Sequence, residues 1–231
     1  MSYEYNSFDS RPSFWNSLPV AVRNLILINF IVWGATELIG MRSADGENWI
    51  YQTFALFAFE SPFFRPWQLV THLFMHGGFW HIFFNMYSLL IFGSVLERMW
   101  GARKFLVFYF VAGLGAALCH CLVMHFQIDA ALAAENTTKA FSIMRTPTVG
   151  ASGAIYGVLM GYGMLFPNDR LTLIFPPITL NAKWFVIIFI VIELVTGIMG
   201  ADNIAHFAHL GGMLFGWLLI LYWKKKNRLY Y

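Results

Sequence analysis

Some of the residues in this chain that could do chemistry lie in unusually apolar surroundings. Ser152 sits in the stretch GASG, Gly150 to Gly153, at the start of an apolar run. A serine at a helix N-terminus has an exposed hydroxyl beside unpaired backbone N–H groups, which suits a nucleophile and an oxyanion. Such a nucleophile needs a base within about 3 Å. The alternative is packing, because Gly153, Gly157 and Gly161 form a small-residue ridge.

Candidate bases lie near the C-terminus, in the stretch NIAHFAHLGGMLFG. His206 and His209 are three residues apart and share one helix face. Gly212 and Gly216 continue the face of His209 as a second small-residue ridge. Two such ridges would allow close packing and bring a histidine to Ser152 without help from a loop. The alternative for each histidine is an interhelical hydrogen bond.

Further polar residues stand within expected membrane spans, where their cost makes them functional candidates by default. His81 and Asn85 are four residues apart and point the same way. An imidazole and a carboxamide are both donors and suit a developing oxyanion, although a polar clamp between helices is equally open. Glu37 and Glu193 could pair with a hydroxyl or stay protonated, and we assign neither a catalytic role.

The composition indicates a polytopic membrane protein. The 231 residues are 58% hydrophobic and 12% charged, with a mean hydropathy of +0.59, and soluble domains carry about twice that charge. Runs of roughly 20 apolar residues match the ~30 Å of hydrocarbon that a helix must cross. The predicted spans are 19–39, 80–100, 104–126, 151–166, 184–199 and 204–223. The fourth and fifth are short, which predicts that each either lies flat to the membrane normal or starts below the membrane surface in a water-filled cavity.

The distribution of charge predicts that both termini are cytoplasmic. Eleven of the 15 Lys and Arg then fall in inside segments, as the positive-inside rule requires. The predicted organisation is a cytoplasmic segment (1–18), a membrane domain (19–223) and a basic tail (224–231). We expect the aromatic outer loop 40–79 to lie half-sunk in the outer leaflet and the loop 127–148 to be polar and mobile. Cys119 and Cys121 are expected to be free thiols.

Together these motifs resemble the rhomboid family of intramembrane serine proteases, in its bacterial type. The match comprises GASG, AHLGGMLFG (208–216) and HIFFN (81–85), each on the expected span, with PWQLVTHLFMHGGFWH in the first outer loop and LERMWG after the second span. The resemblance covers most of the chain. It implies an all-α, six-transmembrane-helix bundle with a long membrane-embedded first outer loop.

The resemblance also implies roles for single residues. Ser152 matches the nucleophile, and His209 matches the base because Ala208, Gly212 and Gly216 complete the pattern AHxxGxxxG around it. The other matching positions are His81, Asn85 and the Ser152 backbone N–H for the oxyanion, Tyr156 against the histidine, and Gly150, Gly153, Gly212 and Glu97 in support. No acid is expected to orient His209, since the family uses a Ser–His dyad. Gln68 stands where the family commonly has arginine.

The function implied is cleavage of transmembrane segments, in a cavity open to the outside and capped by residues 200–203. Expected partners are transmembrane protein substrates and lipids, with no cofactor, no metal and no nucleic acid. The expected location is a bacterial inner membrane, and the oligomeric state is not predicted. One alternative is a catalytically silent, client-binding relative. The other is a metal enzyme that uses His72, His76, His206 and His209 as histidine boxes.

Overall fold

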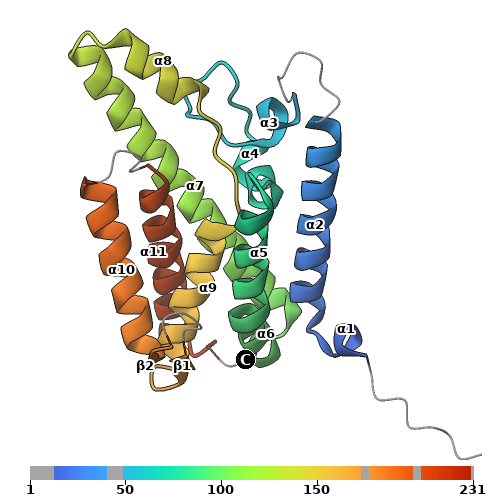
Figure 1. Cartoon of the computed structure of the whole chain (residues 1–231). Helices are drawn as coiled ribbons and strands as arrows, with labels where there is room; N and C mark the ends of the chain where they lie inside the picture. Colours follow the sequence, from blue (N-terminus) through green and yellow to red (C-terminus); the bar gives the residue numbers. More distant parts are fainter. Residues whose placement is uncertain (1–12, 41–48, 173–176, 200–203, 230–231) are drawn as a thin grey trace, which may run out of the picture.

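The protein is a bundle of helices in the computed structural model, which describes residues 13–40, 49–172, 177–199 and 204–229 (Figure 1). The predicted cap of the cavity, residues 200–203, lies outside this part of the chain. The α-helices are α1 (Phe14–Ser17), α2 (Val20–Gly40), α3 (Trp49–Phe54), α4 (Gln68–Thr71), α5 (Phe79–Ser88), α6 (Ser94–Trp100), α7 (Ala102–Ala133), α8 (Thr137–Arg145), α9 (Ser152–Leu165), α10 (Ala182–Met199) and α11 (Ile204–Lys225).

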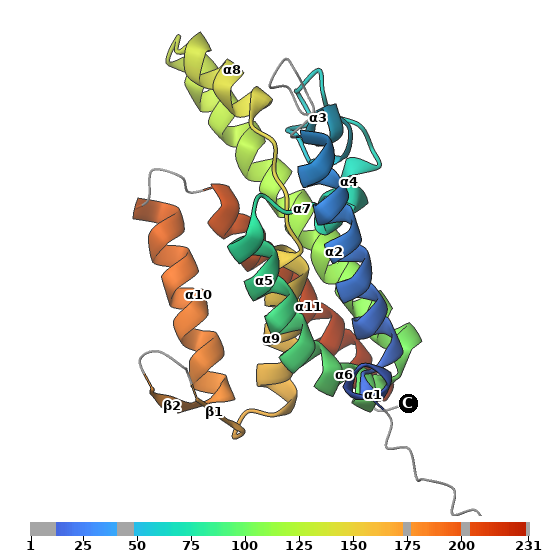
Figure 2. The ribbon, with the colours of Figure 1, turned by 45° about the vertical axis from the view of Figure 1, so that its right-hand side comes forward.

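Five helical segments in the described residues are long and apolar enough to cross a membrane. They are α2, α7, α10, α11 and the continuous run Phe79–Trp100, in which the π-helical turn η2 (Leu89–Gly93) joins α5 to α6. The sixth apolar helix, α9, has only 14 residues and is about 21 Å long. It begins near mid-height of the bundle (Figures 1 and 2). These findings confirm the predicted six-helix membrane bundle.

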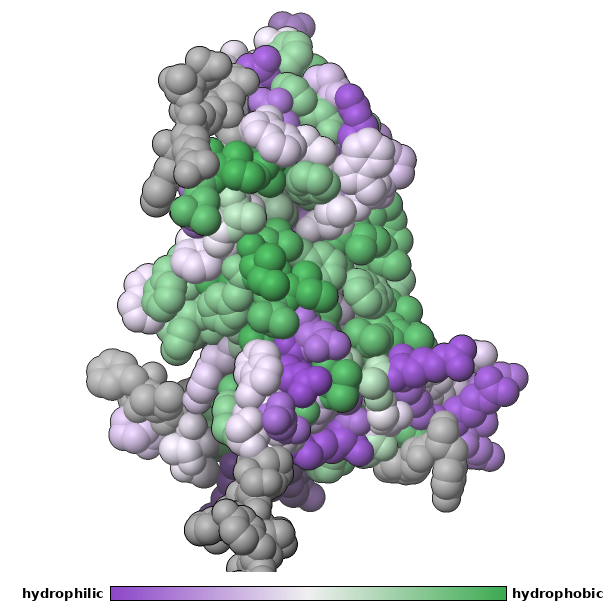
Figure 3. Space-filling view, turned by 90° about the vertical axis from the view of Figure 1, so that its right-hand side faces the viewer, coloured by the Kyte–Doolittle hydropathy of each residue, from purple (hydrophilic) through white to green (hydrophobic). Residues whose placement is uncertain are grey.

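The surface is consistent with a lipid environment. On the face in Figure 3, hydrophobic residues gather at mid-height and hydrophilic residues gather toward the lower end. Many large apolar side chains are exposed, including Phe84 on α5 and Met199 on α10. Exposed apolar surface of this extent is unusual for a soluble monomer and marks contact with a membrane or a partner.

One prediction about local structure was wrong. The segment 127–148 is largely helical, because α7 continues to Ala133 and α8 follows it. The Asn136 side chain accepts a hydrogen bond from the Lys139 N–H and caps α8. Ala140 and Ile143 of this helix are buried in one cluster with Met124 and Ile128 of α7. The chain also holds a short antiparallel pair, β1 (Arg170–Thr172) with β2 (Thr179–Asn181).

Glycines bring α9 and α11 together as their ridges predict. A Cβ at Gly212 would lie 1.9 Å from the carbonyl oxygen of Gly153, and one at Gly216 would lie 3.1 Å from that of Gly157. The two backbones therefore approach closer than any side chain would permit. The prediction was wrong for Gly161, because the atoms nearest to it belong to Phe108 of α7 and to Leu96.

Candidate active site

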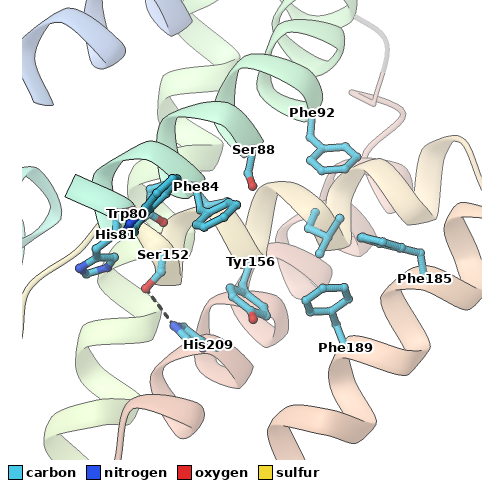
Figure 4. Close-up of a pocket in the computed structure, with 13 residues that line it drawn as sticks. Trp80, His81, Phe84, Ser88, Phe92, Ser152, Tyr156, Phe185, Phe189 and His209 are labelled. Atoms are coloured by element: carbon cyan, nitrogen blue, oxygen red, sulfur yellow. Dashed lines mark hydrogen bonds between the residues drawn. The ribbon is translucent and has the colours of Figure 1, made fainter. Parts of the chain in front are cut away.

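Ser152 and His209 meet where α9 begins. Ser152 is the first residue of α9, and its Oγ lies 2.9 Å from Nε2 of His209 on α11 (Figure 4). This distance suits a hydrogen bond between a hydroxyl and a general base. His206, the other candidate base, points elsewhere, because its Nδ1 lies 2.6 Å from an oxygen of Glu193.

A cavity of about 560 Å³ opens beside this pair. Its polar lining comprises Ser152, His209, His81, Asn85 and Ser88, and its apolar walls include Trp80 and Phe84 from α5 and Phe185 and Phe189 from α10. Figure 4 shows Ser152 between His81 and His209, with Trp80 of α5 close to them and Phe185 and Phe189 of α10 farther along the cavity. The cavity therefore joins a polar end to an apolar groove.

His81 can present a donor to this cavity. The Gly77 N–H donates to His81 Nδ1 over 3.4 Å, which assigns the ring proton of the neutral tautomer to Nε2. A Cβ at Gly150 would lie 2.8 Å from this Nε2, and Gly150 has a φ of +129°. Only glycine combines this backbone conformation with so close an approach. The imidazole is thereby held against the turn that precedes Ser152.

Two further donors lie nearby. Asn85 is buried, and one of its amide hydrogens is donated to the His81 carbonyl oxygen over 3.0 Å. The second amide hydrogen could serve an oxyanion in the cavity that Asn85 lines. The Ser152 backbone N–H belongs to the first turn of α9, where N–H groups have no partner within the helix. The three predicted oxyanion donors thus surround one cavity.

Tyr156 contacts the histidine face to face. Its ring lies one turn beyond Ser152 on α9 and stacks on His209, with centroids 4.1 Å apart and planes 4° apart. This contact fixes the plane of the imidazole. The structure therefore places Tyr156 where the resemblance predicts it.

The prediction that no acid stands beside His209 was wrong. Glu193 of α10 is 4% exposed, and its Oε1 lies 3.1 Å from His209 Nδ1. The contact has an ion-pair distance but lacks the alignment of a regular hydrogen bond. Sequence spacing could not reveal it, because Glu193 and His209 stand on separate helices that meet only through packing. The one available signal was an ionisable residue inside an apolar span.

The first outer loop holds the chain segment that leads into Ser152. The Gly150 N–H donates to the His72 carbonyl oxygen over 2.9 Å, and Leu56 pairs with Thr148 through backbone hydrogen bonds. Gln68 is fully buried. Its amide nitrogen donates to carbonyl oxygens of Gln52, Thr53 and Phe63. An uncharged amide therefore anchors the loop here, in place of the arginine common in the family.

Two loop histidines are kept neutral. Burial lowers the pKa of His72 to about 4, although a 2.7 Å hydrogen bond between its Nδ1 and the Gln68 carbonyl opposes the shift. Burial and the nearby His81 lower the pKa of His76 to about 3. The His72 ring bonds the loop, whereas neither ring nitrogen of the buried His76 has a regular hydrogen-bond partner among the described residues.

One group of side chains in the described residues could hold a metal ion: Glu193, His206 and His209. The carboxylate oxygens lie 2.6 Å and 3.1 Å from the two histidine nitrogens. Ligands at ~2.1 Å around tetrahedral zinc stand about 3.4 Å apart, so these shorter distances fit hydrogen bonding better. His72 and His76 do not belong to this group, and the two histidine boxes therefore form no joint cluster among the described residues.

Glu97 lies outside the cavity. Its two carboxylate oxygens accept hydrogen bonds from the backbone N–H groups of Ala21 and Val22, over 2.8 Å and 2.7 Å. These N–H groups belong to the first turn of α2, where a negative charge is favourable. Glu97 thus ties the second span to the start of the first.

The fold and the site define an integral membrane protein that holds a serine and a histidine at hydrogen-bond distance inside a helical bundle. A sequence model of the Rhomboid domain matches residues 64–226, which is more than two thirds of the chain. The chain belongs to the rhomboid family.

Three relatives illustrate this membership. The chain is 26% identical over 161 residues to Rhomboid-like protein 19 of Arabidopsis thaliana. It is 29% identical over 167 residues to the putative rhomboid protease YdcA of Bacillus subtilis (strain 168), and 29% identical over 164 residues to the rhomboid protease AarA of Providencia stuartii. The matches cover 69%, 71% and 66% of this chain. They cover 49%, 71% and 54% of the relatives, so the chain spans about half the length of two of them.

Proposed function

We propose that the chain is an intramembrane serine endopeptidase that uses Ser152 as nucleophile and His209 as general base. The observation that carries the proposal is the 2.9 Å contact between Ser152 Oγ and His209 Nε2 at the polar end of the cavity. The similarity to proteins described as rhomboid proteases supports the same activity. Because the family also contains proteins described only as rhomboid-like, activity has to be measured.

The proposed reaction is acyl transfer to Ser152. His209 Nε2 takes the hydroxyl proton as Ser152 Oγ attacks a peptide carbonyl, and the oxyanion accepts hydrogen bonds from His81, Asn85 and the Ser152 N–H. The C–N bond then breaks, and His209 gives its proton to the leaving amine. Water attacks the acyl ester and loses a proton to His209, which then returns a proton to Ser152 Oγ as the ester C–O bond breaks and the second product leaves. No cofactor enters these steps.

The proposed substrates are transmembrane segments of other proteins. The aromatic walls of the cavity, from α5 and α10, can contact an apolar segment while its scissile carbonyl reaches the polar end. A helix must unwind there, because a hydrogen-bonded carbonyl in an intact helix is shielded from attack. The resemblance to the family implies small residues at the cleavage site and helix-weakening residues below it. Membrane lipids form the remaining surroundings.

The proposed orientation has both termini in the cytoplasm. The start of α2 and the C-terminus lie at one end of the bundle, with β1 and β2, and opposite to α3 and α8 (Figure 1). The excess of Lys and Arg in the segments assigned to this end supports it. Ser152 then lies in the outer half of the membrane. The resemblance to the bacterial type of the family suggests a bacterial inner membrane, although the relatives come from both plants and bacteria.

The test is cleavage of a purified transmembrane test substrate in liposomes. Wild-type protein should cleave it, whereas Ser152→Ala and His209→Ala should each lose at least about 1,000-fold in kcat/KM. Ser94→Ala is the matched control, because Ser94 is a serine within a span that lies away from the cavity lining. Full activity in either the Ser152 or the His209 variant would refute the assignment. An inactive wild type that still binds the substrate would favour the client-binding alternative.

A further inference from the structure

Glu193 is the centre of a buried polar cluster that a Ser–His dyad does not require. Its carboxylate is 4% exposed and lies on α10, outside the lining of the cavity. Oε1 accepts a hydrogen bond from the Tyr156 hydroxyl and lies 3.1 Å from His209 Nδ1. Oε2 lies 2.6 Å from His206 Nδ1. A carboxylate can accept all of these contacts, and an ionised one buried in a span is costly unless it is so paired.

His209 stands between this carboxylate and the serine. Nε2 faces Ser152 Oγ at 2.9 Å, and Nδ1 faces Glu193 Oε1 at 3.1 Å. To accept the serine proton, neutral His209 must carry its own proton on Nδ1. A carboxylate beside Nδ1 favours that tautomer and stabilises the imidazolium that follows. The imperfect alignment of the contact is compatible with this role, because catalytic hydrogen bonds often tighten only when substrate binds.

The neighbours of Glu193 hold it toward His209. His206, which stands one turn before His209 on α11, also has its Nδ1 3.1 Å from Thr196 Oγ1 on α10. The His206 ring is therefore held against α10. This contact occupies Oε2 and leaves Oε1 directed at Tyr156 and His209. Tyr156 both bonds the carboxylate and stacks on the imidazole. The cluster thereby gives His206, which the sequence motif leaves without a role, a place beside the site.

We propose that Glu193 is a positioning residue for His209, and that His206 and Tyr156 hold its carboxylate in place. The proposal rests on the proposed function of Ser152 and His209 and adds to that pair a third residue that positions the base. Glu193 touches no reacting atom. It acts by setting the tautomer and orientation of the base and by offsetting the charge that the base acquires.

The test compares full-length wild-type, Glu193→Gln, Glu193→Asp and Ser152→Ala proteins in liposomes, with Glu37→Gln as the matched control. Glu37 lies on α2 and does not line the cavity. Gln keeps the shape of Glu but removes the charge and can place a donor against Nδ1. We expect kcat of Glu193→Gln to fall at least about 10-fold, with KM within about twofold. Glu193→Asp should retain more activity than Gln, because its charge remains. The corresponding exchange in a Ser-His-Asp enzyme costs about 10⁴-fold.

A second measurement separates positioning from a merely structural role. A small fluorophosphonate modifies Ser152 only in folded molecules, so the rate constant of this reaction reports the reactivity of the folded site. The measurement needs no transmembrane substrate. This rate should fall with kcat in Glu193→Gln, while the midpoint of thermal unfolding stays near that of wild type. His206→Gln should lower the same rate by a smaller factor.

Three results would overturn the proposal. One is a Glu193→Gln variant with wild-type kcat and labelling rate while Ser152→Ala is inactive, which leaves the proposed function intact. Another is a Glu193→Gln variant whose lost activity matches its lost folded fraction, since Glu193 would then only stabilise the bundle. A wild type that is itself inactive would overturn this proposal together with the proposed function.

Discussion

Two buried glutamates, Glu97 and Glu193, are both 4% exposed and yet belong to different kinds of region. Glu97 accepts hydrogen bonds from two backbone N–H groups of α2, whose positions are set by the helix. Glu193 contacts three side chains, of Tyr156, His206 and His209, which can rotate and exchange protons. Burial does not distinguish the two acids, but their partners do. A carboxylate on fixed N–H groups holds two helices together, and one on titratable side chains can tune a reaction.

The largest expected effect comes from separating the two helices that carry Ser152 and His209. Gly212→Ala would place a Cβ 1.9 Å from the Gly153 carbonyl oxygen, so α11 must move away from α9. We expect a loss of about 3 kcal/mol in stability and no measurable cleavage, because His209 moves with α11. Thermal unfolding in detergent and cleavage in liposomes check this. Gly34→Ala is the matched control, since a Cβ there meets nothing within 4 Å; equal behaviour of the two variants would contradict the close packing.

The next effect separates the two acids. Glu97→Gln removes the charge from two hydrogen bonds and turns an amide N–H toward one of the α2 donors. Hydrogen bonds to charged groups contribute about 1.5–3 kcal/mol each, so the unfolding midpoint should fall clearly. The kcat per fluorophosphonate-reactive site should stay within about twofold of wild type. An unchanged midpoint with a lower kcat would reverse the roles that we assign to Glu97 and Glu193.

The smallest effect is a pH dependence of the loop that supports the site. The pKa of buried His72 is about 4 in the folded protein and ordinarily near 6.5, so the unfolded state binds more protons between these values. The stability that neutral His72 contributes is therefore fully present above about pH 6.5 and is lost as the pH falls toward 4. The loss from His72 reaches about 2 kcal/mol at pH 5. Unfolding midpoints from pH 8 to pH 5 measure this. His72→Gln should flatten the slope, and an equal slope in this variant would contradict the assignment.

Much of the fold follows from the sequence, because lipid imposes simple rules. Long apolar runs predict the spans, and the ridges through Gly157 and Gly212 predict which helices touch. The motifs around Ser152 and His209 likewise predict a pair that the fold brings within 2.9 Å. Where a pattern repeats along one helix, the spacing of the residues is enough to predict which face of that helix packs against a neighbour.

Contacts that no motif or repeated pattern marks could not be predicted in this way. Glu193 carries no motif, and only the packing of α10 on α11 brings it to His209. Gly161 continues the ridge of α9 but faces Phe108, because α9 packs against α7 as well as α11. Gln68 replaces a charged anchor with an amide, and its three carbonyl partners become apparent only in the folded loop.

The most direct test of the central claim is the site of fluorophosphonate modification, determined by mass spectrometry on the purified full-length protein. We predict a single adduct on Ser152 in wild-type protein, because His209 makes this serine alone nucleophilic. His209→Ala should slow the modification at least about 1,000-fold while Ser94→Ala leaves it unchanged. An adduct on another residue, or equal labelling of Ser152 without His209, would contradict the account.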